Sequence, residues 1–193
     1  MSLEKDWNII KVKLPLEIAQ IGNGFICADK LIDFLIQAED HRYRYHWGFD
    51  TISIIRALYK NLFKGTKEGA STIEQQLVRV LTSDYERSVG RKCKEIILAT
   101  RLKKIATKRE IALVYLNIAY YGTDYQNLDS ILQKYNLCKK DDIPDEICAE
   151  IVARLKYPEP HSISRKRIKQ IEVRAKYILN RYNKNRYGRK KLF

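Results

Sequence analysis

Long apolar runs are missing from this 193-residue chain. The best candidate, "LIDFLIQA" at 31–38, is interrupted by Asp33 and falls well short of the roughly 20 residues that a membrane-spanning helix needs. The segment from Met1 to Asp6 runs straight into mixed polar sequence and does not have the pattern of a signal peptide. We therefore expect a chain that can lie on a membrane without crossing it, and we find no export signal.

Cysteine is scarce, and glycine-rich phosphate loops are absent. The four cysteines have no CxxC spacing and no histidine at ligand distance, so we expect buried free thiols and no zinc site. They are Cys27, Cys93, Cys138 and Cys148. No Rossmann glycine pattern, P-loop or internal repeat occurs, which disfavours nucleotide-binding and solenoid architectures.

Acidic residues are in short supply relative to basic ones. Lys and Arg number 37 against 23 for Asp and Glu, which gives a formal charge of +14. Residues 165–191 hold twelve basic residues and a single acid, Glu172. Such a tail favours a polyanion, either an anionic membrane surface or nucleic acid. The alternative is a solvated helix face that keeps the protein soluble.

Helical periodicity dominates the sequence after residue 30 and predicts a mainly α domain. Residues 1–30 look irregular, with "KVKLPLEI" as a short extended piece. Predicted helices cover 31–39, 52–62, 91–105, 128–135, 144–155 and 168–182. Ser71–Glu74 and Thr107–Glu110 both have the form of a capping box that starts a helix. We expect an irregular N-terminal segment (1–30), one main domain (31–180) and a basic C-terminal tail (181–193).

The stretch "AEDHRYRYHWGFD" at 38–50 combines carboxylates, imidazoles and aromatic rings. Glu39, Asp40 and His46 could form an acid-base corner that binds a sugar, or they could be an ordinary helix end followed by a polar loop. Two more polar blocks follow, "EGASTIEQQL" at 68–77 and "ERSVGRKCKE" at 86–95. Arg91 and Glu95 in the second block are four residues apart, which also suits a plain surface ion pair.

Taken in order, these blocks resemble the signature motifs of the peptidoglycan glycosyltransferases, glycosyltransferase family 51. "EDHRYRYHWGFD" resembles the first motif, and "HWGFD" is similar to the monofunctional biosynthetic transglycosylases. "GASTIEQQL", the Arg91-Lys92-x-x-Glu95 pattern and "KREIALVYLN" at 108–117 resemble the next three, and "LKYPEP" resembles a weaker fifth. The resemblance covers roughly residues 30–180 and implies a lysozyme-like helical domain with a central cleft.

The resemblance implies an inverting enzyme that polymerises a lipid-diphosphate-linked disaccharide (lipid II). Glu39 would be the general base that takes the proton from the 4-hydroxyl of the acceptor sugar, a task that needs a partly desolvated carboxylate. Glu95 would be the second catalytic carboxylate, on the leaving-group side. By analogy with inverting glycosidases, the two would lie about 6.5–9.5 Å apart.

The leaving diphosphate needs cations around it. The resemblance assigns substrate binding to residues of the first three motifs: Asp40, His46, Ser71, Gln75, Gln76, Arg79, Arg87, Arg91 and Lys92. A divalent cation, Mg²⁺ or Mn²⁺, is an option at Asp40 with the donor diphosphate. The implied partners are lipid-linked donor and acceptor glycans, an anionic membrane surface and other cell-wall synthesis proteins. The implied location is the outer side of the cytoplasmic membrane, with peripheral attachment.

The chain also departs from the family pattern. Ala70, Glu74, Val80, Leu113 and Lys156 stand where the family has Gly, Thr, Asn, Glu and Pro. We interpret Glu74 as the acid of a capping box, whereas Leu113 removes a charge near the cleft. The apolar residues Ile52, Ile55, Leu58 and Leu62 predict either a helix at the membrane interface or a core-facing helix.

Three other functions stay open. The first is a catalytically silent protein on the transglycosylase scaffold that binds lipid-linked glycan or a cell-wall synthase, which Leu113 favours. The second is a nucleic-acid-binding helical domain, which only the basic tail suggests and which gives Glu39 and Glu95 no role. The third is a lysozyme-like hydrolase, which the basic cluster beside the carboxylates disfavours.

Overall fold

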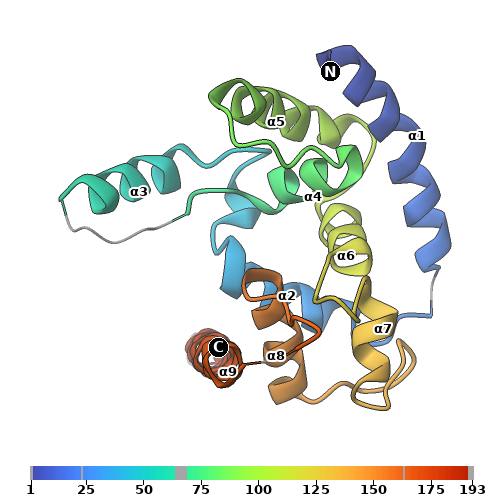
Figure 1. Ribbon diagram of the computed structural model, residues 1–193, viewed down its shortest axis with the longest axis vertical. Helices are drawn as coiled ribbons and strands as arrows, with labels where there is room; N and C mark the ends of the chain where they lie inside the picture. Colours follow the sequence, from blue (N-terminus) through green and yellow to red (C-terminus); the bar gives the residue numbers. More distant parts are fainter. Residues whose placement is uncertain (1, 23, 64–68, 163, 191–193) are drawn as a thin grey trace. The chain divides into compact units, whose positions relative to one another are not determined.

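The computed structural model describes residues 2–22, 24–63, 69–162 and 164–190, without the side chains of 58, 61 and 187–190. Its helices are α1 (Leu3–Ile21), α2 (Ala28–Glu39), α3 (Thr51–Phe63), α4 (Ile73–Thr82), α5 (Val89–Arg101), α6 (Lys108–Ile118), α7 (Leu128–Gln133), α8 (Asp145–Lys156) and α9 (Arg165–Lys190) (Figure 1). Short 3-10 turns cover Tyr43–Tyr45 and Leu102–Lys104. The described residues contain isolated β-bridges at Gly122 and no strand, which confirms the mainly α prediction.

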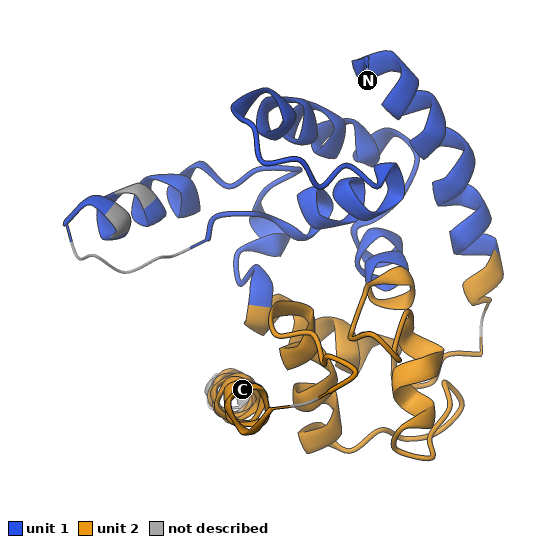
Figure 2. Ribbon diagram, in the orientation of Figure 1, with its two compact units in different colours: residues 1–19, 39–115 blue, residues 20–38, 116–193 orange. Residues whose placement is uncertain are grey.

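The chain divides into two compact units (Figure 2). Unit 1 comprises residues 1–19 and 39–115, and unit 2 comprises residues 20–38 and 116–193. Each has its own buried apolar side chains, for example Leu77 and Leu98 in unit 1 and Phe34 and Ile151 in unit 2. Every predicted site residue falls in unit 1. The domain boundaries expected from the sequence stay a prediction.

The N-terminal stretch is helical, so the prediction of an irregular segment with a short extended piece is wrong. Asp6, Ile10 and Leu14 recur at four-residue spacing on the buried face of α1. The apolar residues of α1 do not follow a clear helical period, because the buried face includes the charged Asp6 while the apolar Val12 is exposed. Asp6 is compensated by Lys94 of α5 at 2.7 Å, and this contact raises the pKa of Lys94.

Two predicted capping boxes have different outcomes. The box at Thr107–Glu110 is confirmed, because the Glu110 backbone N–H donates to the Thr107 hydroxyl and the Glu110 carboxylate accepts from the Thr107 backbone N–H. The box at Ser71–Glu74 is wrong. Thr72 is the N-cap of α4 and accepts from the Gln75 backbone N–H, so the Glu74 side chain is free to point elsewhere.

Unit 2 is organised around α8 and α9. The helix predicted over 144–155 is observed as α8, and Pro144 is its N-cap, where a missing N–H is tolerated. α9 packs against α8 and buries Ile171, Ala175 and Ile178 at helical spacing. Tyr182 of α9 stacks on Phe34 of α2 with ring centroids 4.0 Å apart. The predicted tail begins inside this helix, and its last three residues, 191–193, lie outside the described residues.

The apolar face of α3 is exposed. Figure 1 shows α3 extending away from the other helices of its unit, and Ile55 and Leu62 are 67% and 75% exposed. Ile52, Tyr59 and Phe63 are also exposed, and the rings of the last two lie 5.2 Å apart. The core-facing alternative is therefore wrong for these side chains, while that of Leu58 lies outside the described residues.

Two further sequence predictions concern thiols and membrane spans. Cys27 and Cys148 are buried free thiols as predicted, and burial raises the pKa of Cys148 to about 12. Cys93 and Cys138 are exposed, because each lies on a helix face or loop that no other element covers, so the prediction is wrong for them. Among the described helices, none combines the length and apolar character that a membrane span requires.

Gly48 provides the sharpest backbone constraint in unit 1. Its φ is +87°, and a Cβ there would lie 2.5 Å from the Thr100 backbone nitrogen. Gly48→Ala should therefore lower the free energy of unfolding by about 3 kcal/mol or more, since strain and a backbone clash add. Gly22→Ala is the control, because its φ is +61° with open space around it, and it should cost only about 1 kcal/mol. Urea unfolding measures both, and equal losses would contradict the clash.

Candidate active site

Glu39, the last residue of α2, lies beside one face of α4. Its carboxylate accepts a hydrogen bond from the Gln76 side-chain amide at 3.2 Å. Arg79 is three residues further along α4, so it lies next to Gln76 on the same helix face. The half-buried carboxylate of Glu39 is therefore held at this face.

Glu95 lies on the same side of α4, contributed by α5. It is buried and accepts hydrogen bonds from Arg79 at 2.9 Å and from Arg91 at 2.5 Å. Lys92 Nζ is a further 3.7 Å from the carboxylate. Three cations around one anion leave this cluster with a positive excess. The surface ion pair that the spacing of Arg91 and Glu95 allowed is thus wrong, because Glu95 is buried and shared between two helices.

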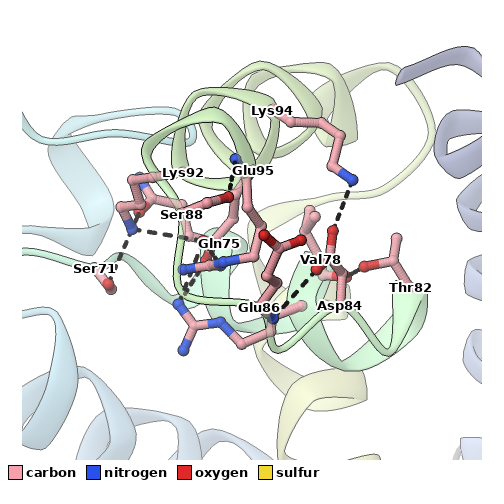
Figure 3. A network of polar contacts seen from close by, with 12 residues as sticks. Ser71, Gln75, Val78, Thr82, Asp84, Glu86, Ser88, Lys92, Lys94 and Glu95 are labelled. Carbon is pink, nitrogen blue, oxygen red and sulfur yellow. Dashed lines mark hydrogen bonds and ion pairs between the residues drawn. The ribbon is translucent and has the colours of Figure 1, made fainter. Parts of the chain in front are cut away.

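Lys92 links the cluster to the loop before α4. Figure 3 shows it reaching Ser71 and Gln75, and its ammonium donates to the Ser71 hydroxyl at 3.1 Å and to the Gln75 side-chain oxygen. Burial lowers the pKa of Lys92, with Arg79 and Arg91 acting in the same direction against Glu95. A cation in this setting gains from an anionic ligand, because the ligand relieves repulsion from the two arginines.

The predicted pair Asp40 and His46 occupies the other end of α4. The Asp40 carboxylate lies 3.0 Å from His46 Nε2 and accepts from the Ile73 backbone N–H at 3.3 Å. An acidic group at a helix N-terminus is favourable because unpaired N–H groups point at it. Both side chains are largely buried. Asp40 and His46 therefore orient the start of α4, which carries Gln75 and Gln76.

A second buried ion pair adjoins Asp40. Glu74, fully buried, pairs with Lys108 at the start of α6. The Lys108 ammonium also lies 3.9 Å from the Tyr43 ring centroid and 4.9 Å from that of Trp47. Burial lowers the pKa of Lys108, opposed by Glu74. Glu74 is therefore the partner of a distant lysine and not the acid of a capping box.

Asp40, His46 and Glu74 also form the one three-residue group, among the described residues, whose ligating atoms lie within 4.8 Å of one another. Glu74 Oε2 and His46 Nδ1 have no hydrogen-bond partner among those residues. The donor types suit Mn²⁺ or a similar ion. Lys108 already supplies a positive charge here, however, and an ion would have to displace it.

The structure brings most of the predicted residues together and omits one. Arg87 is exposed, and no described contact joins it to the cluster around Glu95. Tyr115 was not identified from the sequence as part of the site, and neither was the ion pair between Lys108 and Glu74. Burial and the charge of Glu39 raise the pKa of Tyr115 while Arg79 opposes this, so the ring lies near both groups. Its position in "KREIALVYLN" was the available signal.

Comparisons with known proteins identify what the chain is similar to. A family model described as Transglycosylase matches residues 24–183. Penicillin-binding protein 1A of Vibrio cholerae is 37% identical over 126 residues, which cover 65% of this chain and 14% of that protein. Monofunctional glycosyltransferase of Staphylococcus saprophyticus is 37% identical over 116 residues, 58% of this chain and 43% of that protein. Its counterpart in Staphylococcus aureus strain Newman is 35% identical over 125 residues, 62% and 46%. The aligned part spans less than half the length of each of these relatives.

Replacing Lys108 should destabilise the fold, because the buried carboxylate of Glu74 would lose its cation. Lys108→Met leaves a fully buried carboxylate without its cation, so the free energy of unfolding should fall by about 3–5 kcal/mol. The double variant Lys108→Met/Glu74→Thr removes both charges and should recover most of this loss. Urea unfolding, with the exposed Lys104→Met as control, measures the effect. A single variant within about 1 kcal/mol of wild type would contradict the pairing.

Proposed function

The chain belongs to the transglycosylase family, and from that premise we propose that it is an inverting peptidoglycan glycosyltransferase. Its substrate would be a lipid-diphosphate-linked disaccharide, lipid II, which it polymerises into glycan strands. One observation carries the proposal: Gln76 and Arg79, neighbours on one face of α4, bind Glu39 and Glu95 respectively. Two carboxylates and a set of cations therefore share one side of one helix.

Glu39 acts as the general base in this proposal. It takes the proton from the 4-hydroxyl of the acceptor sugar as that oxygen attacks the anomeric carbon of the donor. The new bond joins the acceptor oxygen to the anomeric carbon, and the bond from that carbon to the diphosphate oxygen breaks. The Gln76 side-chain amide donates to the Glu39 carboxylate at 3.2 Å, and this hydrogen bond helps to orient the proposed base.

The cluster around Glu95 stabilises the leaving diphosphate. The side chains of Arg79 and Lys92 are each about a third exposed, so part of each can meet a ligand. Arginine can grip phosphate oxygens with two parallel hydrogen bonds. Glu95 is the second carboxylate of the proposal, on the leaving-group side, where it holds Arg79 and Arg91 in position. Ser71 and Gln75 accept hydrogen bonds from Lys92 and so fix its ammonium group. In the proposal they also make polar contacts to the donor sugar or phosphate.

A divalent cation is part of the proposal as a charge partner for the donor diphosphate. Asp40, with His46 and Glu74 beside it, is the group that could hold such an ion. When bound, the ion would neutralise developing charge on phosphate oxygens. Arg87 keeps its proposed contact to substrate only if the diphosphate reaches the exposed segment before α5.

Membrane contact follows from the lipid tail of the proposed substrate. The exposed apolar face of α3, which includes Ile55 and Leu62, suits a helix that lies in the headgroup layer. Peripheral attachment at the outer side of the cytoplasmic membrane, beside other cell-wall synthesis proteins, completes the proposal. A catalytically silent protein that binds the same glycan is the second candidate, because Leu113 is a buried apolar residue where the family has an acid.

Glu39→Gln tests the catalytic assignment. Loss of a general base should lower the polymerisation rate of labelled lipid II by about 10²–10⁴-fold, with little change in unfolding. Glu146→Gln, which removes an exposed carboxylate of α8, is the matched control and should keep full rate. The assay uses gel separation of glycan products in detergent, with and without EDTA followed by Mg²⁺ or Mn²⁺. Wild-type protein that binds lipid II but makes no polymer would favour the silent binder, and an unaffected Glu39→Gln would refute the role of Glu39.

A further inference from the structure

The outward face of α9 carries a row of lysines. Ile171, Ala175 and Ile178 are buried and define the side of α9 that packs on the rest of unit 2. At 100° per residue, the side opposite to them bears four exposed lysines, which we call the lysine face. They are Lys166, Lys169, Lys176 and Lys184.

The charges of the lysine face are not compensated within the described part of the protein. Two arginines of α9 contact other parts of unit 2. Arg174 donates to the Ala38 carbonyl, and Arg186 pairs with Asp145 at 3.6 Å. None of the four lysines has a hydrogen bond or ion pair with a described residue, and α9 contains a single acid, Glu172. Four like charges held in a row repel one another, so an anionic partner would stabilise the arrangement.

The shape of the lysine face favours a flat partner. A helix rises 1.5 Å per residue, so the row from Lys166 to Lys184 is straight and about 27 Å long. Val173 and Tyr177 lie between the lysines and are 60% and 48% exposed. An apolar and an aromatic side chain flanked by lysines suit a headgroup layer, where rings settle and ammonium groups meet lipid phosphates.

A nucleic-acid partner fits this surface less well. Proteins that read sequence place Arg, Lys, Asn or Gln against base edges, usually from a helix or loop that enters a groove. Here the Arg181 guanidinium donates to the Tyr177 hydroxyl, and the Arg174 guanidinium lies 5.5 Å from the centroid of the same ring. The side of α9 opposite to its buried stripe therefore carries its charge on lysines, which act as point charges toward a surface.

From these observations, we infer that the lysine face of α9 docks the protein on anionic phospholipid. This inference rests on the peripheral attachment in the proposed function and deepens it by naming the surface and the lipid class, and it involves no catalytic residue and only side chains of unit 2. The face acts through charge, whereas the apolar face of α3 would act on any bilayer. Binding should therefore depend on anionic lipid and fall as salt is raised.

The test compares two variants of the full chain that remove the same number of charges. One changes all four residues of the lysine face to Gln, and the other changes Lys5, Lys11, Lys103 and Lys104, which are exposed elsewhere, to Gln. Vesicles of phosphatidylcholine with about one third phosphatidylglycerol are sedimented and compared with pure phosphatidylcholine vesicles. Each lysine at the surface should be worth about fivefold in partition, so the first variant should bind several hundredfold more weakly to anionic vesicles. The second should change binding by less than about tenfold, because distant charges are screened.

Two more measurements separate the effect of charge from effects on folding and on catalysis. Replacing the four lysines with Arg should preserve vesicle binding, which shows that charge and not folding is responsible. The Gln variant of the lysine face should keep its polymerisation rate in detergent, where no anionic surface is present, so docking and catalysis are separated. Equal loss of binding in the two Gln variants would overturn the inference. So would wild-type protein that ignores anionic vesicles but binds an RNA homopolymer through the lysine face.

Discussion

The buried carboxylate of Glu95 is the constraint on which the candidate site depends. A buried charge is tolerated only with close partners, and Glu95 has Arg79 from α4 and Arg91 from its own helix. Without this anion the two guanidinium groups and Lys92 would repel one another. With it, they remain side by side and partly accessible. The same contact joins α4 to α5, and α4 in turn presents Gln76 to Glu39. The carboxylate of Glu39 and the cation cluster around Glu95 therefore contact the same face of α4.

Features with local causes could be predicted from the sequence. The helix predicted over 168–182 lies within α9, and Ile171, Ala175 and Ile178 are buried on it because helical spacing decides which residues share a face. The box formed by Thr107 and Glu110 was predictable because both partners lie within one turn. The order of four motifs indicated the family, and a family model now matches residues 24–183. The type of fold and the family were therefore predictable from the sequence, while the roles of the site residues stay a prediction.

Features with distant partners could not be predicted in this way. Glu74 looked like a capping acid, yet its cation is Lys108, which is 34 positions away. Arg79 and Glu95 meet only because two helices pack together, so the four-residue spacing of Arg91 and Glu95 suggested a weaker surface pair than the structure contains. α1 was missed because its buried face includes Asp6, whose partner Lys94 belongs to α5. In each case, a charge is buried by a partner that local spacing does not reveal.

The affinity of the full chain for inorganic diphosphate tests the central claim most directly, because it isolates the cation cluster from sugar and lipid. Isothermal titration should show binding by wild type that weakens about ten- to hundredfold in Arg79→Gln, as expected for loss of a charge-assisted hydrogen bond. Lys104→Gln, an exposed change of the same charge, should bind as wild type does. Equal affinity in wild type and Arg79→Gln would contradict an anion site organised by Glu95.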